Sequence, residues 1–132
     1  MPEAVVARVA AMLATEGAAL QSLQMGMALP GMSPCPTAVL DTARVIAGLD
    51  VVITVDTMVA HLAGAIGVPV WLLLDAAPDW RWLAGEGGGA QGSPWYRGIR
   101  RYRQTEAGDW SEPVRAMLSD LTSLTQAGTV VL

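Results

Sequence analysis

The stretch VVITVDTMVAHLAGAIGVPVWLLL, residues 51–74, decides the fold of this 132-residue chain. Val51 to Val55 form a mainly β-branched run without polar alternation, which is typical of a parallel strand covered by helices on both faces. A helical pattern follows Asp56-Thr57 and closes at Gly67, and Val70 to Leu74 forms a second buried run. Strand, helix and strand in so few residues predict a βαβ unit, with the strand 51–55 central in its sheet.

The flanking sequence predicts further helices and strands around this unit. Residues 2–15 and 111–126 place apolar side chains at helical spacing, and Asp41 or Thr42 can cap a helix that runs through Leu49. A short strand is expected over 19–24, a long loop over 75–98 and an edge strand over 100–104. The pattern predicts one α/β domain over residues 1–132, a Rossmann-like three-layer αβα sandwich with a mainly parallel sheet.

Composition and charge exclude several classes of protein. Apolar residues make up 52% of the chain and charged residues 15%, which is the balance of a folded domain. All eight basic residues are arginine, and the net charge is −4. Because of this acidic balance, nonspecific binding of nucleic acid is not expected. A cluster of four arginines is interpreted as a solvated edge strand whose stems cover apolar surface, with an anion or partner contact as the alternative: Arg97, Arg100, Arg101 and Arg103.

Cysteine content and hydropathy indicate the cellular compartment in which the protein is expected. Cys35 is the one cysteine, so neither an internal disulfide nor a paired-cysteine metal site can form. The longest apolar run, 66–74, contains Pro69 and falls short of the ~20 residues of a membrane-spanning helix. The amino-terminal residues lack the pattern of a signal peptide. We therefore expect a soluble, cytoplasmic protein. The glycine-rich run 85–92 has no strand before it and no helix after it, and is interpreted as a flexible insertion.

Chemistry is expected where the strand 51–55 ends. In parallel sheets, ligands bind beyond the carboxyl ends of the strands, where helix N-termini present free N–H groups. Thr57 and His61 are four residues apart and share one helix face. A hydroxyl, backbone donors and an imidazole together suit a diphosphate. The alternative is that Asp56 or Thr57 merely caps the helix and that His61 is a half-buried structural histidine.

Residues 51–65 resemble the D-T-x-x-x-H-L-A-G-A segment of the heptosyltransferase-like (family 9) glycosyltransferases, especially those linked to tetratricopeptide repeats in bacteria. Further segments match the family in the same order, so the resemblance covers nearly the whole chain: Ser22-Leu23-Gln24, Asp41-Thr42-Ala43, Trp71 to Leu74, Ala77 to Leu83, Ser93 to Tyr96, Arg103-Gln104 and Gly108 to Trp110.

The resemblance implies the C-terminal donor domain of a GT-B glycosyltransferase, which is one half of a GT-B fold. Such a domain binds a nucleotide-diphosphate sugar, needs no metal ion or cofactor, and in the whole enzyme serves transfer of the sugar to an acceptor hydroxyl. By resemblance, Asp56, Thr57, Met58 and His61 line the sugar-diphosphate site, and Trp80 and the 93–96 segment lie near the donor or support it. Loop packing is the alternative role of the tryptophans. No catalytic residue is assigned.

Two departures from the family qualify this expectation. The family motif S-L-Q-K-G carries Met25 here in place of a lysine that would face the phosphates. The family domain's first strand and the acceptor domain have no counterpart in the sequence. The alternative function is therefore a degenerate, non-catalytic nucleotide-sugar-binding or structural module. A homodimer or a separate acceptor domain is the expected partner, because a missing strand leaves apolar sheet edges uncovered. A dinucleotide-dependent oxidoreductase domain would need a glycine fingerprint that is absent.

Overall fold

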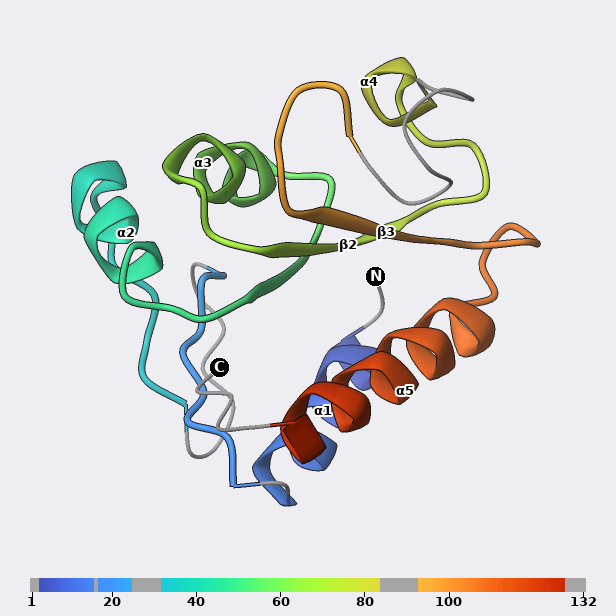
Figure 1. The fold of residues 1–132 in the computed structure, drawn as a ribbon, viewed down its shortest axis with the longest axis horizontal. Helices are drawn as coiled ribbons and strands as arrows, with labels where there is room; N and C mark the ends of the chain where they lie inside the picture. The colour runs from blue at the N-terminus through green and yellow to red at the C-terminus, as the bar shows by residue number, and fades with distance from the viewer. Residues whose placement is uncertain (1–2, 16, 25–31, 84–92, 128–132) are drawn as a thin grey trace.

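The computed structural model describes residues 3–15, 17–24, 32–83 and 93–127, and these form an α/β domain with a three-stranded, all-parallel sheet. The strands are β1 (Val52–Val55), β2 (Val70–Leu74) and β3 (Ile99–Arg103), in the order β1-β2-β3. In the described ranges, five helices flank the sheet: α1 (Glu3–Thr15), α2 (Val39–Ile46), α3 (Met58–Ile66), α4 (Trp80–Leu83) and α5 (Ser111–Ala127). Figure 1 shows α2, α3 and α4 on one face of the sheet and α1 and α5 on the other.

The central strand is β2, whose five residues are all buried. Trp71 and Leu73 face α1 and α5, while Val70, Leu72 and Leu74 face α2 and α3, as the two-residue period of a strand requires. The βαβ unit is confirmed as β1, α3 and β2, with parallel pairing of β1 to β2. The prediction that 51–55 is central was wrong within the described sheet, because β1 lies at its edge and is half-buried over 53–55.

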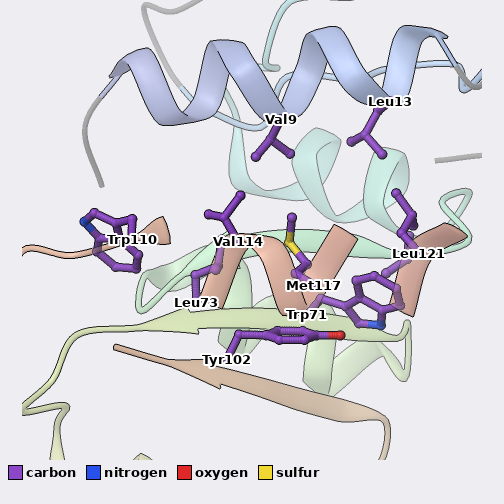
Figure 2. Packing of buried hydrophobic residues seen from close by; sticks show 10 residues of the cluster. Val9, Leu13, Trp71, Leu73, Tyr102, Trp110, Val114, Met117 and Leu121 are labelled. Carbon is purple, nitrogen blue, oxygen red and sulfur yellow. The ribbon is translucent and has the colours of Figure 1, made fainter. Parts of the chain in front are cut away.

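One hydrophobic core lies between the sheet and the helices α1 and α5 (Figure 2). Val9 and Leu13 of α1 point toward Met117 and Leu121 of α5 and toward the sheet, where the ring of Trp71 completes the layer. Each such side chain contributes about 1.5–3 kcal/mol when fully buried. Packing therefore holds these two helices in place more than their intrinsic helix propensity does.

A second core lies between the other face of the sheet and α2 and α3. The face of α3 that packs inward is made of small residues, Ala60, Ala63 and Gly64, so the helix backbone approaches its neighbours closely. The helix ends at Gly67, which has a φ of 92° and donates its N–H to the Ala63 carbonyl, as the sequence predicts.

Three local predictions were wrong. The helix α2 begins at Val39 behind Ala38, because the buried Thr42 hydroxyl bonds back to the Ala38 carbonyl at 3.1 Å instead of capping. Residues 19–24 form no strand, only an isolated bridge between Gln21 and Ser33. The expected loop 75–98 contains the short helix α4.

The helix predicted over 2–15, the edge strand over 100–104 and the helix over 111–126 are confirmed within about one residue, as α1, β3 and α5. Within the described part of the chain, none of the helices combines the length and the apolar character needed to cross a bilayer.

Candidate functional site

The amino end of α3 lies where β1 ends, at the carboxyl edge of the parallel sheet. Asp56, Thr57 and Met58 are all exposed there. Thr57 is the N-cap residue in an extended conformation (φ −147°, ψ 172°) and makes no side-chain capping hydrogen bond. Its hydroxyl instead lies 3.3 Å from that of Thr54. The Thr57 side chain therefore caps none of the first-turn N–H groups at the positive end of the helix dipole, although the Ala60 N–H donates to the Thr57 carbonyl at 3.0 Å.

His61 lies one turn into α3 and is held on both edges and one face of its ring. Its Nδ1 is 3.1 Å from the Tyr96 hydroxyl, and its Nε2 is 3.7 Å from Asp56 Oδ1. Trp82 stacks on the imidazole, with ring centroids 5.2 Å apart and planes 26° from parallel. The side chain keeps 33% of its surface exposed, so the imidazole is fixed in orientation but still reachable.

Gly64 makes the Tyr96 contact possible. A Cβ atom built on Gly64 would lie 2.7 Å from Cγ of the Tyr96 ring, closer than real Cβ contacts. The ring of Tyr96 therefore occupies the space that a larger residue would take on this face of α3. The sequence carries a faint signal for this role, because a lone glycine inside a helical pattern often marks close packing.

A hollow of about 150 Å³ lies at the carboxyl ends of β1 and β2. Three acidic residues contribute to its lining, Asp56, Asp75 and Asp79. Among the described residues, no group of histidine, cysteine, aspartate and glutamate is arranged to hold a metal ion. Of the predicted site residues in this part of the chain, only Asp56 lines the hollow.

The loop after β2 is fixed from β3 by side-chain hydrogen bonds. Arg103 donates from its guanidinium to the Ala76 carbonyl, and Gln104 Oε1 accepts from the N–H groups of Ala76 (3.3 Å) and Gly108 (3.2 Å). Arg101 donates to the Trp82 carbonyl at the end of α4. These arginines therefore hold the loops around the site. The sequence had predicted only that they form a solvated edge strand whose side-chain stems cover apolar surface.

The tryptophans near the site divide into buried and exposed ones. Trp82 is 2% exposed, whereas Trp80 and Trp95 are 64% and 57% exposed. The two exposed rings meet edge to face, with centroids 6.3 Å apart. Trp82 therefore serves core packing, whereas Trp80 and Trp95 do not contribute to the core.

The structure brings some of the predicted site residues together. Asp56 and His61 are in contact, and Thr57 and Met58 lie exposed between them in the chain. Trp80 belongs to a separate cluster with Trp95. Met25 and the glycine-rich run 85–92 lie outside the described residues.

No protein-family model, no curated protein and no solved structure matches this chain. The likeness to heptosyltransferase-like enzymes therefore rests on the sequence motifs alone.

Proposed function

We propose that the chain is the nucleotide-sugar-binding domain of a GT-B, heptosyltransferase-like glycosyltransferase, with a Rossmann-like fold. The first turn of α3 receives the diphosphate of a nucleotide-diphosphate sugar. The proposal rests on the exposed amino end of α3, where the Thr57 side chain makes no capping hydrogen bond and the imidazole of His61 is fixed one turn along. Backbone N–H groups and the helix dipole stabilise the charge of a diphosphate that departs when the sugar passes to an acceptor hydroxyl.

Each residue of the site has a role in this proposal. Tyr96 holds Nδ1 of His61, which leaves Nε2 to exchange its 3.7 Å contact with Asp56 for a phosphate oxygen. The Asp56 carboxylate repels each unit charge of the diphosphate by about 1 kcal/mol at 4 Å in water. Hydrogen bonds to a charged group contribute about 1.5–3 kcal/mol each and outweigh this repulsion.

The proposal implies two kinds of partner. The nucleotide-diphosphate sugar binds this chain, and a second domain or a second copy of the chain supplies the acceptor side. No metal ion or cofactor takes part in the binding step as proposed.

A proline at the first position of α3 tests the role of the backbone amide. Met58→Pro removes one N–H group but keeps the helix, because proline fits the first helical position and the preceding Thr57 is already extended. Met58→Ala is the matched control, which keeps the amide. In calorimetric titrations with UDP-, ADP- and GDP-sugars, Met58→Pro should weaken binding by about tenfold and Met58→Ala by less than about twofold. His61→Ala should weaken it as well.

Two results would contradict the proposal. The first is that none of these nucleotide sugars binds the wild-type chain saturably. The second is that Met58→Pro and Met58→Ala bind with equal affinity, which would remove the first-turn amide from the site.

A non-catalytic structural module is the second candidate function. Asp56, Asp75 and Asp79 around the hollow disfavour an anionic ligand, and Met25 stands where the family has a lysine. In that case no nucleotide sugar binds. His61→Ala then changes only the stability of the domain, because the ring loses its contacts with Tyr96 and Trp82.

A further inference from the structure

Trp80 and Trp95 are large apolar side chains that stay exposed although they are well ordered by their neighbours. Their indole rings lie edge to face, with 6.3 Å between centroids and 86° between planes. The Trp95 indole N–H donates to the Arg81 carbonyl at 3.2 Å, and the Trp95 amide donates to the Ser93 hydroxyl at 3.2 Å. A surface that is already ordered loses little conformational entropy when a ligand binds.

The pair shares its supporting segments with His61. Trp80 precedes Trp82 by two residues in α4, so the two side chains point in different directions and only Trp82 stacks on the imidazole. Trp95 directly precedes Tyr96, whose hydroxyl contacts the same ring. The exposed pair and the imidazole are therefore held by the same two stretches of chain.

The size of the pair selects a small ligand. A tryptophan buries roughly 150–250 Å², so two half-exposed rings offer on the order of 200–300 Å². A stable protein interface needs about 800 Å² on each partner. The pair is thus large enough for one small ring and much too small for a protein partner.

The shape and the polar neighbours of the pair favour a saccharide over a base. Rings at 86° form a corner, whereas a planar base stacks on parallel faces. The C–H face of a pyranose packs against an indole, and its hydroxyls need donors and acceptors at the rim. The guanidinium of Arg81 supplies donors there, because its central carbon lies 6.0 Å from the Trp80 ring centroid, while Arg81 Nε lies 3.3 Å from Asp79 Oδ1.

We propose that Trp80 and Trp95 form a second subsite that binds a pyranose ring of a saccharide. Saccharide binding itself follows from the two rings and their rim and needs no nucleotide.

Tryptophan emission during titration with cellobiose, chitobiose and methyl β-D-glucopyranoside tests the subsite. At least one of these should bind the wild-type chain saturably. Trp80→Ala and Trp95→Ala should each weaken that binding by at least about tenfold, since each removes a stacking partner worth about 1–3 kcal/mol in comparable ring stacking. Trp80→Phe keeps a ring and should restore most of the affinity. Both tryptophans are exposed, so circular dichroism should show folded variants.

The results separate this inference from the proposed function. Failure of all three saccharides to bind, or binding that Trp80→Ala leaves unchanged, overturns the subsite even if nucleotide sugars bind through the α3 amide. Saccharide binding that Trp80→Ala abolishes supports the subsite even if no nucleotide sugar binds. Self-association of the wild-type chain that Trp80→Ala abolishes in ultracentrifugation would make the pair a protein contact and overturn the subsite.

Discussion

The orientation of His61 depends on a neighbour without a side chain. Gly64 leaves room for Tyr96, and the Tyr96 hydroxyl then meets Nδ1 of the imidazole at 3.1 Å. Helix propensity alone favours alanine over glycine inside a helix by about 1 kcal/mol. Close packing of Tyr96 works against that gain, so the sign of the Gly64→Ala effect reports which of the two dominates.

We expect Gly64→Ala to lower the free energy of unfolding by about 1–3 kcal/mol, since the added methyl group forces the Tyr96 ring away. Urea denaturation measures this change. His61 is the single histidine, so the proton NMR signals of its ring should shift as well. Gly48→Ala is the control, because its Cβ would lie an ordinary 3.5 Å from the Val45 carbonyl oxygen. A Gly64→Ala variant that is more stable than the wild type would show that Tyr96 is not held in this way.

From the sequence, spacing could bring together only those candidate site residues that lie close to one another in the chain. Asp56, Thr57 and His61 could be placed because they follow a strand at helical spacing. Spacing could not join Tyr96 to His61, since 35 residues separate them, and only the family resemblance placed the 93–96 segment near the donor. The pairing of Trp80 with Trp95 was hidden for the same reason.

At the scale of elements, a half-buried polar cluster joins β3 to α5. The Tyr102 hydroxyl donates to Asp120 Oδ2 at 3.0 Å, and Arg100 lies 2.9 Å from the same oxygen. Burial, followed by the hydrogen bond to Asp120, raises the pKa of Tyr102 well above its ordinary value. The folded state therefore favours the neutral phenol.

This cluster predicts a loss of stability at alkaline pH. A tyrosine in the unfolded chain ionises near pH 10, so above about pH 10 ionisation stabilises the unfolded state while folded Tyr102 stays neutral. The chain has no lysine, so few other groups titrate in that range. At pH 8 the wild type should be about 1 kcal/mol more stable than Tyr102→Phe, which lacks the hydrogen bond. Urea denaturation from pH 8 to 11 should show this gap shrinking, and a constant gap would exclude ionisation of Tyr102 as the cause.

The sequence predicted α1, α3 and α5, the helices that bury a periodic apolar face, and the strands β1, β2 and β3. It failed where tertiary contacts decide the conformation. Residues 19–24 have strand-like composition, but a strand forms only with a ladder partner, and the described residues offer just one bridge. The start of α2 was misplaced because Thr42 is buried and cannot act as a cap.

At the scale of the whole molecule, an apolar cavity that is partly open to solvent lies between α1 and β1. It holds about 120 Å³, and its lining includes Ala10, Leu20, Leu23 and Ile53. A larger apolar side chain at Ala10 should bury additional apolar surface in this cavity.

Ala10→Leu should raise the free energy of unfolding by about 1 kcal/mol, because the added carbons enter the cavity and leucine keeps the helix propensity of α1. Ala11→Leu on the same helix is the control, since Ala11 is exposed and its replacement should change stability by less than about 0.5 kcal/mol. Thermal and urea unfolding measure both variants. A destabilised Ala10→Leu with an unchanged Ala11→Leu would mean that the space is too narrow for a leucine.

The two faces of the sheet are completed at different points along the chain. Strand order follows chain order, and α3 covers the same face as α4, whereas the first and last described helices, α1 and α5, together cover the opposite face (Figure 1). On the ribosome, α3 emerges between its two strands and can shield Leu72 at once. The face that carries Trp71 can pack on α1 from the start but gains α5 only about 40 residues later, so a nascent chain exposes part of this apolar face in the interval.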